Sequence, residues 1–108
     1  LAGKLAGVIE ITSEGPILIS GLDLPTRDAV CLALLGAYVG DKLGRMIKDT
    51  LSSGELSRIT GKARKTISNE IPRLASDGLI AKTPEGQYGI TTLGIRKTED
   101  VIEELKPK

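Results

Sequence analysis

The 108-residue sequence predicts an α+β domain with a helical core and two β-hairpins. Two short helical patterns on either side of a glycine, in the segment 54–78, are the first observation behind this prediction. The second is a pair of β-rich patterns with turn signals, one at the N-terminus and one over residues 79–91. Apolar residues make up 40% of the chain and charged residues 27%, which is typical of a single globular domain.

The N-terminal segment is expected to form a β-hairpin. Leu5–Thr12 and Ile17–Ser20 are β-rich, and Ser13-Glu14-Gly15-Pro16 between them is a turn signal. The chain does not begin with methionine, so we expect it to be a piece of something longer. Residues 1–25 are therefore interpreted as a hairpin extension that could be the end of a missing upstream domain.

A buried helix is predicted next. Asp23 or Thr26 can cap it, and Pro25 is expected in its first turn, where proline is tolerated. The stretch Ala29–Gly40 contains no charged or strongly polar residue, which indicates burial on all sides. Because glycine lowers helix propensity, Gly40-Asp41 could instead mark a break between two helices.

Small residues on this helix suggest a contact with a second copy of the chain. Glycines spaced by four would lie on one stripe and allow another helix or strand to approach closely. We expect a homodimer through this helix, and the predicted interface residues are Ala33, Gly36, Ala37, Gly40 and Gly44. The alternative is that the N-terminal strands cover the second face of the helix within one chain.

The segment 54–78 predicts two helices joined by a tight turn. Leu56 and Ile59 fit one face of the first helix, and Gly61 follows where positive φ is needed. The second helix, expected at about residues 63–76, is stopped by Gly78. Its core-facing stripe is predicted to be Ala63, Ile67, Ile71 and Leu74.

A second hairpin is predicted at about residues 79–91. Thr83-Pro84-Glu85-Gly86 suits a type I turn followed by a left-handed residue, and Leu79–Thr83 and Gln87–Thr91 would be its strands. Thr92 can then cap a last helix at about residues 93–105.

This order of elements resembles the winged helix-turn-helix DNA-binding domains of bacterial and archaeal transcription regulators. The resemblance covers residues 50–94 well and the first helix loosely. It implies a three-helix core with a β-hairpin wing, in which residues 63–76 form the recognition helix and 26–108 the whole domain. The residues that carry it are Glu55, Leu56, Thr60, Gly61, Thr66, Ile67, Ser68, Ile71, Leu74, Gly78, Leu79, Ile80, Tyr88, Ile90, Thr91 and Gly94.

Three residues depart from that pattern. Ala63 stands where the family usually has a capping Ser or Thr, which forfeits about 1 kcal/mol. Pro72 lies inside the recognition helix and is expected to kink it or bend its end. The wing tip carries Glu85 and no cluster of basic residues, so insertion of the wing into the minor groove is not expected.

Charge and spacing predict the DNA contacts. The net charge is only +1, but residues 54–73 contain five basic and two acidic residues. Lys65 and Asn69 lie one turn apart on the exposed face and are the predicted base contacts, since Asn pairs with adenine and Lys with guanine. Asn69 could also be an ordinary solvated amide. The predicted phosphate contacts are Arg58, Lys62, Arg64, Thr66, Ser68 and Arg73, and the predicted wing contacts are Lys82 and Gln87.

Composition argues against catalysis. The chain has no histidine and one cysteine, which excludes an ordinary zinc site and the Ser-His-Asp and Cys-His pairs, and no Gly-rich phosphate loop is present. We therefore expect no enzyme activity, metal or cofactor, and we expect Cys31 to be a buried small hydrophobe. No apolar run reaches the ~18 residues of a membrane span, so a cytoplasmic, nucleoid-associated protein without a membrane partner is predicted. The scarcity of thermolabile residues is typical of a thermophile.

Three functions stay open at this level. The first, which the motif favours, is a sequence-specific regulator that binds double-stranded DNA as a dimer, with half-sites about one helical turn apart. By analogy, such a regulator could have a ligand-sensing Rossmann-like domain upstream. The second is an architectural or chromatin-type DNA binder, and the third is a winged helix used for protein–protein contact in a larger complex.

Overall fold

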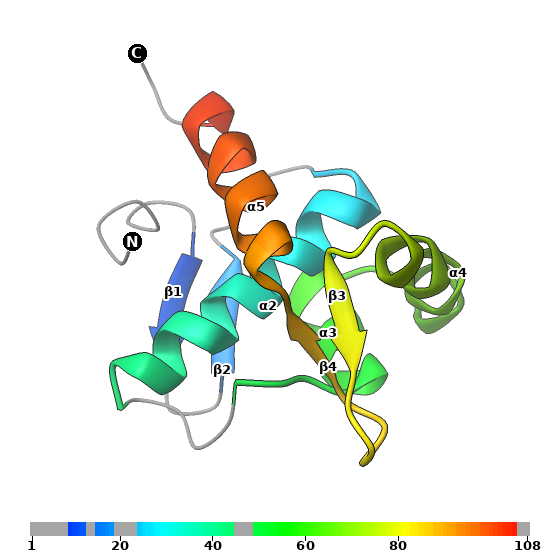
Figure 1. The fold of residues 1–108 in the computed structure, drawn as a ribbon. Coiled ribbons are helices and arrows are strands. Elements are labelled where there is room, and N and C mark those ends of the chain that lie inside the picture. Colours follow the sequence, from blue (N-terminus) through cyan, green and yellow to red (C-terminus); the bar gives the residue numbers. More distant parts are fainter. Residues whose placement is uncertain (1–8, 13–14, 19–23, 45–48, 106–108) are drawn as a thin grey trace.

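Four helices and two antiparallel β-hairpins make up the part of the chain described by the computed structural model, namely residues 9–12, 15–18, 24–44 and 49–105 (Figure 1). The fold class is therefore α+β, as predicted. In chain order the elements are β1 (Ile9–Thr12), β2 (Gly15–Leu18), α2 (Thr26–Lys42), α3 (Ser53–Thr60), α4 (Arg64–Ser76), β3 (Ile80–Lys82), β4 (Tyr88–Ile90) and α5 (Thr92–Leu105).

The first hairpin confirms the prediction of paired N-terminal strands, but Gly15 and Pro16, predicted to lie in the turn, belong to β2. In the register of the two strands, Thr12 pairs with Gly15, and Ile11 pairs with Pro16. Proline is compatible with this position because each strand of a two-stranded sheet has an unpaired edge. The remaining residues of the predicted strands, 5–8 and 19–20, lie outside the described residues.

Helix α2 is the centre of the fold. It begins after Pro25, which has φ −53° and ψ 149° and is the N-cap residue without a side-chain hydrogen bond. The predictions that Thr26 caps the helix and that Pro25 lies in its first turn are therefore wrong, and Asp23 lies outside the described residues. The helix continues through Gly40 to Lys42, so the alternative of a break at Gly40-Asp41 is also wrong.

The small residues of α2 are covered within one chain. Ala33 and Ala37 are fully buried, and Gly36 and Gly40 are buried as well. The helix contacts β1 and β2 along one side and α3, α4, β4 and α5 elsewhere (Figure 1). The prediction that these four residues form a dimer interface is wrong, because segments of the same chain already occupy their surroundings.

Gly44 does not belong to the predicted stripe. It lies beyond the end of α2 and has φ +73°, a left-handed conformation that helical residues do not adopt. The helical spacing on which its assignment to the dimer interface depends is therefore absent. The alternative that the N-terminal strands cover α2 is the one that agrees with the structure.

Two apolar clusters lie on opposite sides of α2. One joins Val30, Ala33, Leu34 and Ala37 to buried residues of α3, α4 and β3. The other contains Leu24, Ala29, Leu32, Leu35, Val39 and Ile102, and links α2 to α5. Burial of apolar side chains on both sides explains why this helix lacks charge over most of its length.

Local hydrogen bonds define α3 and the turn that follows it. The Ser52 hydroxyl accepts from the Glu55 N–H (3.1 Å), and the Glu55 carboxylate accepts from the Ser52 N–H (3.0 Å), which is a complete capping box. Gly61 ends the helix with φ +72°, as predicted. The Ser57 hydroxyl donates to the Lys62 carbonyl (2.7 Å) and stabilises the turn before α4.

Helix α4 lacks a side-chain cap, as predicted, whereas the kink expected at Pro72 stays a prediction. Ala63 is its N-cap and provides no side-chain hydrogen bond, which confirms the missing cap. Pro72 lies inside the helix, which nevertheless continues to Ser76. Gly78 follows with φ +78° and turns the chain into β3.

The second hairpin has the predicted turn, with Gly86 at φ +80° and its N–H donating to the Thr83 carbonyl (3.0 Å). Leu51 and Tyr88 exchange two backbone hydrogen bonds (2.9 and 2.8 Å), so the segment before α3 also pairs with β4, which the sequence did not indicate. Thr91 caps α5 through its hydroxyl, which accepts from the Gly94 N–H (3.0 Å). The prediction that Thr92 is the cap is wrong by one residue.

Candidate nucleic-acid interface

Helix α4 presents one apolar side to the core and one polar side to the outside. Ile67, Ile71 and Leu74 are buried against the rest of the domain, as the spacing predicts. Ala63 is exposed and is not part of this inner stripe, because it precedes the first helical residue. Figure 1 shows α4 at the edge of the molecule opposite the β1–β2 hairpin, so its outer side is not covered by another described element.

Lys65 and Asn69 lie together on the outer side of α4. Both are exposed, and one helical turn separates them. Among the described residues, neither side chain forms a hydrogen bond or an ion pair. The structure therefore places both predicted base-contact residues where a groove of DNA could reach them.

The predicted phosphate contacts surround this pair. Thr66, Ser68 and Arg73 are exposed on α4, and Arg58 is exposed on α3. Lys62 is half-buried in the turn between the two helices. Together with Arg64 these side chains form a polar surface with four basic groups on two successive helices.

Arg64 lies back over the beginning of α3. A Cβ atom added at Gly54 would be 3.5 Å from the Arg64 Nη2 atom, so the guanidinium is close to the first turn of that helix. Helix N-termini carry partial positive charge. The Arg64 guanidinium therefore lies near the capping box of α3, where the Glu55 carboxylate offsets part of the positive charge of the guanidinium and the helix N-terminus.

Glu70 also lies on this surface, where its position could not be predicted from its charge alone. It is half-buried, and its Oε2 atom is buried without a hydrogen-bond partner among the described residues. It lines a small cavity of about 280 Å³ together with Thr26, Thr66, Asn69 and Arg73. A carboxylate here weakens the attraction of its neighbours Thr66 and Arg73 for phosphate without cancelling it, and Arg64 and Ser68 are farther from this charge along α4.

The two predicted wing residues differ in their surroundings. Lys82 is exposed on β3, whereas Gln87 is half-buried. The Gln87 side-chain oxygen accepts a hydrogen bond from the Thr50 hydroxyl (2.7 Å), which connects the hairpin to the segment before α3. Gln87 therefore has a structural role within the domain, and its contact with DNA stays a prediction. Because Thr50 and Gln87 are 37 residues apart, no local sequence pattern indicates this hydrogen bond.

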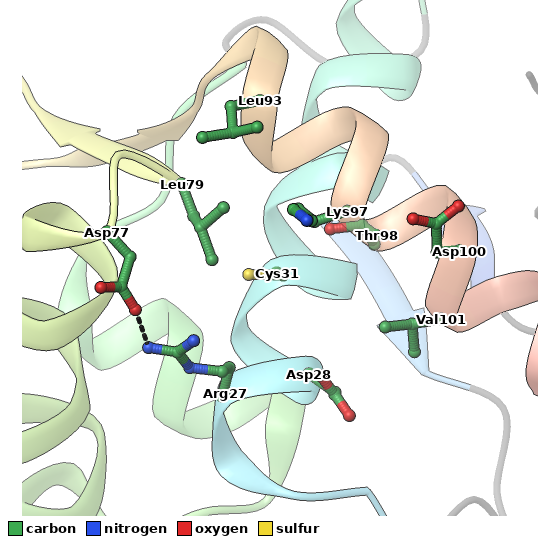
Figure 2. Close-up of a pocket in the computed structure, with 10 residues that line it drawn as sticks. All are labelled: Arg27, Asp28, Cys31, Asp77, Leu79, Leu93, Lys97, Thr98, Asp100 and Val101. Atoms are coloured by element: carbon green, nitrogen blue, oxygen red, sulfur yellow. Dashed lines mark hydrogen bonds and ion pairs between the residues drawn. The ribbon is translucent and has the colours of Figure 1, made fainter.

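An ion pair connects the end of α4 to α2. The Arg27 guanidinium in the first turn of α2 donates to the Asp77 carboxylate at the C-cap of α4 (Figure 2). Both side chains are partly exposed, at 41% and 50%, so solvent weakens the attraction. The contact nevertheless limits how the C-terminal end of α4 can move relative to α2.

Cys31 is buried, as predicted, and this has a consequence at alkaline pH. Burial raises the pKa of its thiol to about 11, above its ordinary value of 9.0. The pKa of this thiol is higher in the folded state than in the unfolded state. The protonated thiol therefore makes its full contribution to the free energy of unfolding below the unfolded-state pKa, and this contribution is lost as the pH rises through the folded-state pKa. We expect the free energy of unfolding of the parent, relative to Cys31→Ala, to decrease by about 2 kcal/mol between neutral pH and pH ~11. Urea unfolding of both proteins across this range measures the difference, and parallel curves would contradict it.

The described residues contain no group of three or more His, Cys, Asp or Glu residues that could hold a metal ion. Within the same part of the chain, no helix has the length and apolar character needed to cross a membrane. No protein-family model, curated protein or solved structure matches this chain. What can be inferred about its function therefore depends on its own residues.

Proposed function

We propose that this chain is a winged helix-turn-helix domain that binds duplex DNA. In this proposal α2, α3 and α4 are the three-helix core, β3 and β4 are the wing, and α4 is the recognition helix. The observation that carries it is the outer side of α4, where Lys65 and Asn69 are exposed, unpaired among the described residues, and flanked by basic side chains. A major groove about 12 Å wide accepts a helix of this kind.

The proposed contacts follow from position. Lys65 and Asn69 would read base edges, since ammonium and amide groups match the donor and acceptor pattern of guanine and adenine. Arg58, Lys62, Arg64, Thr66, Ser68 and Arg73 would bind phosphates and set the orientation of the domain. On the wing, Lys82 and Gln87 are the proposed contacts. Lys82 is exposed and basic, Gln87 is half-buried, and the turn between them carries the acidic Glu85.

A homodimer remains part of the proposal, but not through the small residues of α2. Two recognition helices related by a two-fold axis would bind half-sites about one helical turn apart. Because Ala33, Gly36, Ala37 and Gly40 are buried within the chain, such a dimer would need a different surface. Sedimentation in the micromolar range tests for it directly.

The test is a titration of the domain into fluorescently labelled duplex DNA, followed by anisotropy at two salt concentrations. One duplex comes from the protein's own promoter region, and the other has a random sequence. Tight and selective binding supports a sequence-specific regulator, and tight binding without selectivity supports an architectural protein. Absence of binding to both duplexes would overturn the proposal and leave a protein–protein module.

Two variants separate reading of sequence from binding of the backbone. Asn69→Ala is expected to weaken binding to the preferred duplex by about 1–3 kcal/mol and to relax selectivity at one base pair. Arg73→Ala is expected to weaken binding to both duplexes alike and to reduce the slope of log K against log salt by about 1. Arg96→Ala, an exposed arginine on α5, is the matched control and should bind like the parent. If all three variants bind like the parent, α4 is not the recognition helix.

A further inference from the structure

A second concave site lies away from the outer side of α4. It is an open cavity of about 520 Å³ between the first turns of α2, the chain that follows α4, and the part of α5 from Leu93 to Val101 (Figure 2). This volume is in the range of small-molecule sites, about 300–1,000 Å³. Nothing in the DNA-binding proposal uses it.

The walls of the cavity are largely apolar. Cys31 and Leu79 are buried at its base, and in Figure 2 both side chains point towards its interior. Val101 lines the α5 side. Leu93 stands at the wall with 44% of its surface exposed, one of two large hydrophobic side chains among the described residues with such exposure. A ligand with an apolar body would remove this leucine from water.

The charges around the cavity favour a cation. Arg27 and Asp77 neutralise each other through their ion pair. Of the other lining residues, Asp28 and Asp100 are acidic and Lys97 is basic, and among the described residues none of these three has a hydrogen bond or ion pair of its own. The charged residues that line the cavity and have no partner among the described residues therefore carry a net charge of −1.

Asp28 is the better placed of the two free carboxylates. It is half-buried in the first turn of α2, whereas Asp100 is exposed. Burial raises the pKa of the Asp28 carboxyl, the charge of Arg27 lowers it, and that of Glu104 raises it again. A carboxylate that has lost water without gaining a direct partner binds a cation more strongly than a fully hydrated one does.

We propose that this cavity binds a small cationic amphiphile, a protonated amine on an apolar body of about ten heavy atoms. The apolar body would lie against Leu79, Leu93 and Val101, and the ammonium group would bind the Asp28 carboxylate. This site is independent of the DNA-binding surface. It shares Asp77 and the following turn with the end of α4, so an occupant would contact the segment that anchors that helix.

The experiment uses three probes with the same body and different heads: 4-phenylbutylamine, 4-phenylbutanol and 4-phenylbutyrate. Each is titrated into the ¹⁵N-labelled full chain without DNA, and amide chemical shifts are followed. We expect the amine to shift residues of α2, α5 and the turn after α4, and to bind about tenfold more tightly than the alcohol. Asp28→Asn should weaken binding of the amine about tenfold and leave that of the alcohol unchanged, whereas the control Asp49→Asn should leave both unchanged.

Each other result would overturn the proposal. Preferential binding of the carboxylate would assign the cavity to anions through Lys97, and equal binding of amine and alcohol would remove Asp28 as the counter-ion. The absence of shifts around the cavity with all three probes would exclude a site for this class of ligand. The amide spectrum of Asp28→Asn reports whether the variant is folded. Because DNA is absent, failure here leaves the DNA-binding proposal unaffected, and the converse also holds.

Discussion

Replacing Gly94 by alanine is expected to destabilise the fold by about 3 kcal/mol or more. Gly94 lies in the first turn of α5, directly against the turn that follows α4. A Cβ atom there would be 2.1 Å from the Leu79 carbonyl oxygen and 2.7 Å from the Ile90 Cγ1 atom. Because the first of these is a backbone atom, rotation of a side chain cannot relieve the clash. Denaturant unfolding followed by circular dichroism measures the loss.

A matched glycine provides the control. Gly54 lies in the first turn of α3, and a Cβ atom there would meet its nearest neighbour at 3.5 Å, an ordinary contact distance. Gly54→Ala is expected to keep or raise stability, by up to about 1 kcal/mol, because alanine restricts the unfolded chain and favours helix. If Gly94→Ala unfolds at the same denaturant concentration as the parent, α5 does not approach the α4–β3 turn this closely.

Truncation of Leu56 to alanine is expected to have an effect of similar size, about 2–5 kcal/mol. Leu56 is fully buried in the cluster that joins α3 to α2 and α4. Removal of its side chain leaves a cavity whose walls belong to three helices, so collapse of one helix into the space disturbs the contacts of the others. Small domains are stable by only about 5–15 kcal/mol, so the variant should lose a large share of its stability.

Leu43→Ala is the control for this substitution. Leu43 follows the end of α2 and is 49% exposed, so its truncation should cost less than about 1 kcal/mol. Thermal and urea unfolding of both variants give the comparison. Equal losses would indicate that Leu56 is not in the core, whereas a large loss for Leu56→Ala alone agrees with the packing described above.

The parts of the fold that were predicted correctly depend on local chemistry. Gly61 and Gly86 adopt the positive φ that their turns require, and the absence of a capping side chain at Ala63 is visible in the sequence itself. Helical periodicity placed Lys65 and Asn69 outside and Ile67 inside, because 100° per residue is a property of any α-helix.

Some wrong predictions are local, such as the caps of α2 and α5, but those with the largest consequences concern contacts between distant segments. Nothing local indicates that strands near the N-terminus cover α2, and an apolar helix rich in small residues suits a second copy equally well. The same holds for Gln87, whose partner Thr50 belongs to another element, and for Arg27 and Asp77, which are 50 residues apart. The partly buried carboxylate of Glu70 also follows from packing between elements and not from spacing along α4.

The pairing of Leu51 with Tyr88 has a mechanical consequence for the second hairpin. Two backbone hydrogen bonds and the Thr50–Gln87 contact attach the turn end of β4 to the chain that enters α3. Bending of the hairpin as a whole would therefore pull on the beginning of α3, and through it on the turn that positions α4. Only the turn, Thr83-Pro84-Glu85-Gly86, extends beyond these attachments, so both strands of the hairpin are held to the chain that enters α3.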